Sequence, residues 1–294
     1  HTGTVHSLAF NSDGALLVSS GVDETARIWN TADAKAHCPP LRHEGGGILA
    51  SFSRDGRRVL TYGRDGSARI WDTDTGAARA APIRQPGEIF AAAFHPDGTR
   101  IITAPSDYTQ DARSAQIWNA ATGQPSGPPL PHRDGVLYAG FSPDGKWAAS
   151  ASEDGTAIVW DAATGSPVTP PMRHLSYVWR AGFSPDSRLL LTASMDKTAR
   201  VWDALTGEPV TPPLPHGDQV MEAAWIAGGR EVFTFSLDGI IRIWDVSPAA
   251  GTLDELQREA ELLSSHRLVP GLGVTPLTVE EIRERWRALR PDWK

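Results

Sequence analysis

Ser or Thr, His and Asp side chains recur together along this chain, and serine hydrolases combine the same three types for nucleophilic catalysis. One set consists of His132, Ser150 and Asp154. A hydrolase needs a single set beside its substrate, yet sets with this spacing occur at five places here. We therefore predict no catalytic residue among them. The repetition indicates a shared structural unit.

A tryptophan followed by Asp or Asn marks each copy of that unit. Copies of about 42 residues indicate one supersecondary element that shares a core with its neighbours by stacking. Residues present in every copy then build the fold, and residues present in one copy are candidates for recognition. The marking residues are Trp29, Trp71, Trp118, Trp160, Trp202 and Trp244. The units begin at His1, His43, Gln85, His132, His174 and His216.

The fourth unit shows the elements expected in each copy. Residues 136–141, 147–151 and 156–160 have the composition of short strands, and residues 167–169 are expected to form a fourth strand. Turn sequences such as Ser-Pro-Asp-Gly at 142–145 separate them at the 8–12-residue spacing typical of all-β folds. Of the four strands, the fourth with its loops is where proline recurs, which predicts that this strand is an exposed edge.

The leading His, the Ser-Pro-Asp-Gly turn and the Asp six residues before the Trp together resemble the repeats of the WD40 family. The resemblance covers residues 1 to about 247 and implies an all-β fold, a propeller of four-stranded antiparallel blades. It also implies a structural hydrogen-bonded tetrad in each blade. The implied tetrads are His1, Ser19, Asp23 and Trp29; His43, Thr61, Asp65 and Trp71; His132, Ser150, Asp154 and Trp160; His174, Thr192, Asp196 and Trp202; and His216, Thr234, Asp238 and Trp244.

Two units depart from the pattern. In the third, Gln85 replaces the leading His and five extra residues around Tyr108 lengthen the second turn, so its tetrad is in doubt. The sixth lacks a fourth strand after Asp245. Family propellers close by pairing their two ends, so we expect the missing strand to come from residues before His1. A whole blade upstream would make seven, and the sequence leaves six and seven both open.

Residues 248–294 are expected to form a helical tail packed on the propeller. Thr252-x-x-Glu255 and Thr278-x-x-Glu281 are capping boxes, each followed by apolar residues at helical spacing, and a Gly/Pro-rich link at 270–273 separates them. The tail resembles segments that follow some bacterial WD40 modules. These modules are often fused to serine/threonine kinase domains, which implies a signalling protein with such a domain upstream.

We predict a non-catalytic scaffold or docking module that binds a protein or peptide partner. In WD40 relatives, two positions per blade on the top face often contact peptides, and these positions are apolar in the later units. Large aromatic and Met side chains on an exposed face indicate a partner site. The predicted contacts are Leu137, Tyr177, Trp179, Met195, Met221 and Leu237, with Tyr108 as a further one. The alternative is a channel active site near Arg180 and Glu222.

Composition bounds the remaining function classes. The net charge of −7 and pI near 5.7 argue against a nucleic-acid partner, which normally needs a basic footprint. No apolar run reaches the roughly 18 residues of a membrane span, and no metal-ligand or cofactor motif is visible. The single Cys38 forms no disulfide within the chain and favours a reducing, cytoplasmic location.

Overall fold

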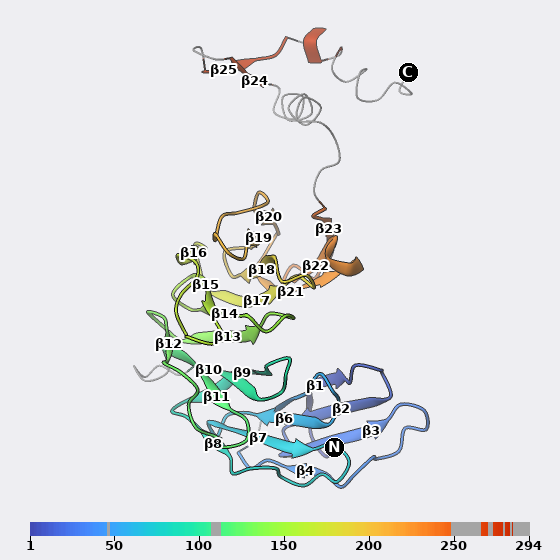
Figure 1. Ribbon diagram of the computed structural model, residues 1–294. Helices are drawn as coiled ribbons and strands as arrows, with labels where there is room; N and C mark the ends of the chain where they lie inside the picture. Colours follow the sequence, from blue (N-terminus) through green and yellow to red (C-terminus); the bar gives the residue numbers. More distant parts are fainter. Residues whose placement is uncertain are drawn as a thin grey trace. The chain divides into compact units, whose positions relative to one another are not determined.

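The computed structural model describes residues 1–45, 48–106, 113–247, 266–269, 273–278, 280–282 and 284. The chain divides into two compact units, His1–Val246 and Ser247–Lys294. The first consists of six antiparallel sheets that follow one another in chain order (Figure 1). Five sheets have four strands, and the last has three. These sheets are the six repeat units, here called blades 1 to 6.

In each of the first five blades, three longer strands are followed by an outer strand of two residues. Blade 1 contains β1 (Val5–Phe10), β2 (Leu16–Gly21), β3 (Thr25–Asn30) and β4 (Leu41–Arg42). Blade 2 contains β5 (Leu49–Phe52), β6 (Arg58–Tyr62), β7 (Ser67–Asp72) and β8 (Ile83–Arg84). Blade 3 contains β9 (Glu88–Phe94), β10 (Arg100–Ser106), β11 (Ser114–Asn119) and β12 (Leu130–Pro131).

The later blades repeat this order, except that the last stops after three strands. Blade 4 contains β13 (Val136–Phe141), β14 (Trp147–Ser152), β15 (Thr156–Asp161) and β16 (Met172–Arg173). Blade 5 contains β17 (Val178–Phe183), β18 (Leu189–Ser194), β19 (Thr198–Asp203) and β20 (Leu214–Pro215). Blade 6 contains β21 (Val220–Ile226), the 3-10 turn η2 (Ala227–Gly229), β22 (Glu231–Ser236) and β23 (Ile241–Asp245).

The outer strand lies later in the repeat than residues 167–169, where we expected it. Pro167 makes only an isolated bridge to Trp160, and β16 pairs with β15 after the two prolines. Proline has no N–H to donate to a ladder, so the paired strand forms beyond the prolines. Each outer strand therefore ends directly before the leading residue of the next blade.

The core consists of five apolar clusters, one at each interface between successive blades. At the first interface, Val18 and Ile28 of blade 1 pack against Val59 and Trp71 of blade 2. Both Val18 and Ile28 are fully buried, and each such side chain contributes about 1.5–3 kcal/mol relative to remaining exposed. Blade-to-blade packing therefore holds the array together.

The second compact unit contains one described hairpin, β24 (His266–Val269) paired with β25 (Gly273–Pro276). The sequence predicted no strand in this region, only a Gly/Pro-rich link at 270–273. The capping box at Thr278 is present: Glu281 Oε2 accepts from the Thr278 amide at 2.8 Å, and Thr278 Oγ1 accepts from the Glu281 amide at 3.3 Å. Residues 280–282 begin a helix at this point. The Thr252 box lies outside the described residues, and the packing of the tail stays a prediction.

Candidate functional site

The hydrogen-bonded set of blade 5 runs from an indole to a carboxylate. Trp202 Nε1 donates to Thr192 Oγ1 at 2.8 Å, and this hydroxyl lies 2.8 Å from His174 Nε2. His174 Nδ1 lies 2.9 Å from Asp196 Oδ2. The side chains of His174 and Asp196 are 0% and 3% exposed, so the network satisfies polar groups that water cannot reach.

Blades 1, 2 and 4 contain the same set. In blade 4, Ser150 Oγ accepts from Trp160 Nε1 at 2.8 Å and lies 2.6 Å from His132, which lies 3.2 Å from Asp154. The corresponding bonds join His1, Ser19, Asp23 and Trp29 in blade 1 and His43, Thr61, Asp65 and Trp71 in blade 2. The histidine and the hydroxyl of the sets in blades 2 and 4 are 0% exposed, as expected of groups that hold the fold.

A further hydroxyl, which we did not predict from the sequence, completes the sets of blades 1, 2, 4 and 5. Thr156 Oγ1 donates to Asp154 Oδ1 at 2.6 Å, and Thr198 does the same to Asp196. Thr25 and Ser67 occupy this position in blades 1 and 2. The signal was visible as a Ser or Thr two residues after each of these Asp residues.

Blade 3 keeps part of the network without its histidine. Gln85 Oε1 accepts from Thr103 Oγ1 at 2.6 Å, and Thr103 Oγ1 accepts from Trp118 Nε1 at 2.8 Å. Gln85 therefore replaces the His contact to the hydroxyl. Residues 107–112, which include Tyr108 and lie within the lengthened second turn, are outside the described residues.

Blade 6 differs from the expected tetrad. His216 contacts Thr234 Oγ1 at 2.7 Å, but its other ring nitrogen lies 3.0 Å from the Leu214 carbonyl oxygen. Asp238 accepts instead from Arg242 Nη1 at 3.0 Å. Ile240 occupies the position of the missing Thr or Ser hydroxyl, so one of the groups that orient the carboxylate elsewhere is absent.

The buried carboxylates make the fold sensitive to acid. Burial alone raises the pKa of Asp196, but hydrogen bonds from His174, Thr198 and the Leu175 amide outweigh it and hold the pKa well below its ordinary value. The pKa of Asp154 is lowered for the same reasons. A carboxyl whose pKa is lower in the folded than in the unfolded chain stabilises the fold above the unfolded pKa. It loses that contribution as the pH falls through the folded pKa.

We accordingly expect Asp196→Asn to lower the free energy of unfolding by about 2 kcal/mol at pH 7. The gap to the unaltered protein should narrow as the pH falls below about 4, the ordinary Asp pKa, because only the unaltered protein loses the Asp196 contribution. Urea unfolding of both proteins at a series of pH values between 7 and 2 measures this difference in the free energy of unfolding. A gap that stays constant over this range would contradict the prediction.

In five of the six blades, the position five residues after the leading His or Gln lies at a register shift in the first strand. The pairing of β17 with β18 shifts register between Val178 and Arg180, and that of β21 with β22 between Val220 and Glu222. Trp179 and Met221 are therefore bulge residues. A bulge redirects its side chain relative to the sheet, which is why these positions vary in exposure from blade to blade.

Most of the predicted partner contacts reach the surface of blades 5 and 6, at the end that carries the second turn of each blade. We call this end the top face. Leu237 is 55% and Tyr177 43% exposed, whereas Trp179, Met195 and Met221 are partly buried. Leu175, which we had not singled out, is 92% exposed on the same end. Leu137 is 5% exposed, so it belongs to the core and not to this surface.

The alternative site near Arg180 and Glu222 is a salt bridge. Arg180 Nε lies 3.3 Å from Glu222 Oε2, and the guanidinium stacks over Tyr138 with 6.0 Å to the ring centroid. Both side chains line a cavity of about 540 Å³. The ion pair joins β17 of blade 5 to β21 of blade 6.

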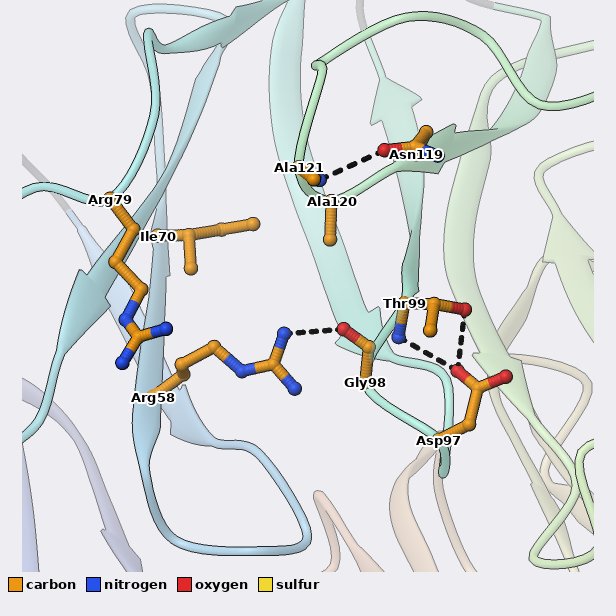
Figure 2. Close-up of a pocket in the computed structure, with 9 residues that line it drawn as sticks. All are labelled: Arg58, Ile70, Arg79, Asp97, Gly98, Thr99, Asn119, Ala120 and Ala121. Carbon is orange, nitrogen blue, oxygen red and sulfur yellow. Dashed lines mark hydrogen bonds between the residues drawn. The ribbon is translucent and has the colours of Figure 1, made fainter.

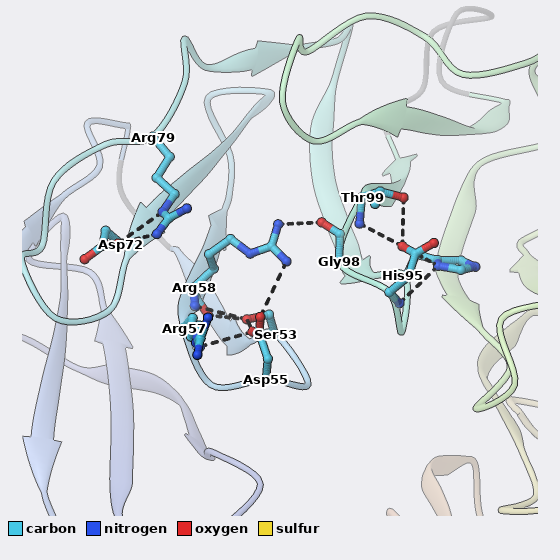
Figure 3. A network of polar contacts seen from close by, with 10 residues as sticks. Ser53, Asp55, Arg57, Arg58, Asp72, Arg79, His95, Gly98 and Thr99 are labelled. Atoms are coloured by element: carbon cyan, nitrogen blue, oxygen red, sulfur yellow. Dashed lines mark hydrogen bonds and ion pairs between the residues drawn. The ribbon is translucent and has the colours of Figure 1, made fainter.

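A second cavity, of about 470 Å³, lies between blades 2 and 3 (Figure 2). Arg58 points across it and donates to the Gly98 carbonyl, and its guanidinium lies 5.3 Å from the Phe94 ring centroid. Arg79 pairs with Asp72 on the blade 2 side (Figure 3), and its hydrogen bonds lower the pKa of Asp72 to about 2. Both guanidinium groups are thus engaged within the protein.

No group of three or more His, Cys, Asp or Glu side chains among the described residues could hold a metal ion. No helix in that part of the chain is long and apolar enough to cross a membrane.

Comparison with known proteins supports the repeat assignment. A family model described as WD40, "WD domain, G-beta repeat", matches residues 1–30, 42–72, 129–161, 165–203 and 207–245, more than half of the chain. Blade 3, with Gln85 and its insertion, is not matched. A crystal structure of the computationally designed Ika8 protein aligns with a TM-score of 0.71 and 22% identity over 83% of this chain and 72% of that one, a likeness of fold. No curated protein matches the sequence.

Proposed function

We propose that this chain, which belongs to the WD40 repeat family, is a non-catalytic scaffold that binds a protein or peptide on the top face of blades 5 and 6. Members of the family generally serve as protein-interaction scaffolds. The observation that carries the proposal is the exposure of three large apolar side chains at the top ends of blades 5 and 6, Leu175, Tyr177 and Leu237. Trp179, Met195 and Met221 are partly buried and lie in the strands and turns at the same end of blades 5 and 6.

The surface combines fixed and adaptable elements. Backbone hydrogen bonds tie the second turns to the segments that enter the blades: the Met195 amide donates to the Tyr177 carbonyl at 3.0 Å, and the Leu237 amide to the Gln219 carbonyl at 2.9 Å. Met side chains adapt to irregular partners, and aromatic side chains bury large areas with little loss of conformational entropy. A partner with apolar side chains would bind such a surface.

Charged groups beside the apolar side chains suit a partner segment that carries both apolar and charged residues. Lys197 Nζ lies 3.7 Å from Asp218 Oδ1 and 3.2 Å from the Gly217 carbonyl oxygen, to which it donates. A polar rim of this kind around an apolar centre is typical of transient protein interfaces. The identity of the partner, a fused kinase domain and a signalling role remain predictions from the family resemblance.

Leu237→Asp is expected to weaken partner binding by at least about 10-fold, since it places a charge within the apolar contact. Affinity capture from cells that express the protein, quantified against the unaltered chain, measures the effect. The matched control is Leu205→Asp, because Leu205 is 52% exposed but lies in the third turn of blade 5, at the opposite end of the strands. Equal capture by both variants, with thermal unfolding unchanged, would contradict this site.

A further inference from the structure

Blades 4 to 6 place three unlike polar side chains at one equivalent position of the first strand. The residues are Tyr138 in β13, Arg180 in β17 and Glu222 in β21, and each directly follows the register shift of its strand. Their equivalents in the first three blades are Ser7, Leu49 and Ala91. An aromatic ring, a cation and an anion are therefore combined at this position in the second half of the array alone.

These three side chains line the cavity of about 540 Å³, which is within the roughly 300–1,000 Å³ of small-molecule pockets. Its other described lining residues carry no charge, and they include Phe183, Pro185 and Trp225. The cavity therefore has a charged part and an apolar part. It contains no residue of the exposed group on the top face, Leu175, Tyr177 and Leu237, so it is a site separate from the proposed partner surface.

Two glycines leave space beside the polar side chains. Residues two apart in a strand face the same side, so Gly182 adjoins Arg180 and Gly140 adjoins Tyr138. A Cβ added at Gly182 would meet nothing within 4 Å, so the surrounding atoms do not require glycine there. A Cβ added at Gly140 would lie 2.5 Å from the Tyr138 hydroxyl, so this glycine makes room for the phenol. The space is open to a ligand and is not filled by the protein.

The polar groups of the cavity have hydrogen-bonding capacity to spare. Arg180 Nε lies 3.3 Å from Glu222 Oε2, but this contact is outside hydrogen-bond geometry, and the enclosed donor has no hydrogen-bond partner among the described residues. Burial raises the pKa of Tyr138, so its hydroxyl remains a donor at neutral pH. Both side chains of the ion pair are 41% exposed, and pairs exposed to this extent contribute little to stability. A ligand can therefore replace their mutual contact while the fold is retained.

We propose that this cavity binds a free α-amino acid with a large apolar side chain. Arg180 binds the carboxylate of the amino acid, Glu222 binds its ammonium group, and its side chain lies in the apolar part beside Phe183 and Trp225. The 3.3 Å between Arg180 and Glu222 selects this class, because the two charges of the ligand must lie close together. An α-amino acid carries both charges on one carbon, whereas a peptide separates its terminal charges by at least one further residue.

The test titrates the protein with L-leucine and with L-phenylalanine and follows binding by NMR. The reporters are the Gly182 amide and the Trp225 indole N–H, which donates to the Gly182 carbonyl oxygen at 2.9 Å. Two analogues of leucine each lack one charge: isocaproate retains the carboxylate, and isoamylamine retains the ammonium group. We expect saturable shifts with both amino acids and at least about 10-fold weaker binding of either analogue, since each lacks one charge-assisted hydrogen bond.

Four variants assign the two charges of the ligand to their partners. Arg180→Gln and Glu222→Gln should each weaken leucine binding at least about 10-fold. Arg180→Gln should then bind leucine and isoamylamine equally, and Glu222→Gln should bind leucine and isocaproate equally, because variant and analogue remove the same contact. Gly182→Val should weaken binding at least about 10-fold by filling the open space. Arg64→Gln is the matched control: it removes the Arg64–Glu88 ion pair of 3.8 Å between blades 2 and 3 and should leave leucine binding unchanged.

Two results would overturn the proposal. In one, neither amino acid produces saturable shifts at concentrations up to about 10 mM, well above the range of a specific small-molecule site. In the other, leucine, isocaproate and isoamylamine bind the unaltered chain equally, which would show that apolar contact alone drives binding, as it would for an apolar side chain of a protein partner. The comparison of ligands uses the unaltered chain, so it decides between these results even where a variant loses its fold.

Discussion

Thr192→Val should lower the free energy of unfolding by about 3 kcal/mol, although valine has nearly the shape of threonine. The Thr192 hydroxyl accepts from Trp202 Nε1 and contacts His174 Nε2, both at 2.8 Å, and Thr192 is 0% exposed. Valine leaves Trp202 Nε1 and His174 Nε2 without their hydrogen-bond partner in a site closed to water, and each unsatisfied buried group costs about 1–3 kcal/mol. Urea unfolding followed by circular dichroism measures the loss, with an unchanged m-value as the check that the fold is retained.

Thr234→Val in blade 6 is the matched control. It removes the same hydroxyl, but Trp244 and His216 are only partly buried, and His216 keeps its contact with the Leu214 carbonyl oxygen. Water can replace part of what is lost, so we expect a cost of about 1 kcal/mol. Equal losses in the two blades would show that enclosure does not set the energy of the network.

The repeat could be predicted from sequence because its signals are local and recur. The spacing of the tryptophans and the turn residues between them define three strands per blade without reference to any neighbour. The bonds from Trp202 to Asp196 follow from the same register, and the structure contains them. Averaging over six copies removes the ambiguity that a single short strand would carry.

Features that depend on a neighbouring element could not be predicted in this way. The outer strand was placed at 167–169, although pairing occurs at Met172–Arg173, because composition does not show which two residues meet the third strand. Leu137 was assigned to the surface, but it lies at a register shift in β13 and is only 5% exposed. In blade 6, the turn of His216 away from Asp238 depends on Arg242 and on Ile240, which the tetrad pattern does not include.

The exposure of the residues in the candidate site could not be predicted from the sequence for the same reason. Tyr177, Trp179, Met195, Met221 and Leu237 were chosen because they vary between copies, and they do lie on blades 5 and 6. Leu175 was not predicted because it follows a leading His, and the sequence alone does not show whether the loop at that position is buried or exposed. At 92% exposure, it is the most exposed large apolar side chain among the described residues.

Gly66→Ala is expected to cost about 3 kcal/mol, more than the substitution of any other glycine in the second turns. Gly66 has φ +69°, and an added Cβ would lie 2.6 Å from the Gln85 carbonyl oxygen and 2.7 Å from that of Gly87. The left-handed conformation alone costs a non-glycine residue about 1–2 kcal/mol. The remainder comes from pushing apart two backbone segments that the amide of Gln85 ties together through its bond to the Gly66 carbonyl.

The chain provides a graded series that separates the two causes. Gly239 has φ +77° and nothing within 4 Å of an added Cβ, so Gly239→Ala should cost only the conformational term, about 1 kcal/mol. Gly155, in the interior blade 4, has its nearest contacts at 3.3 Å and should lie between. Lys197 already occupies this turn position with φ +70°, which shows that the conformation itself is tolerated. Thermal unfolding of the three alanine variants decides: equal shifts would mean that the conformation, and not the close approach of Gln85 and Gly87, requires glycine at residue 66.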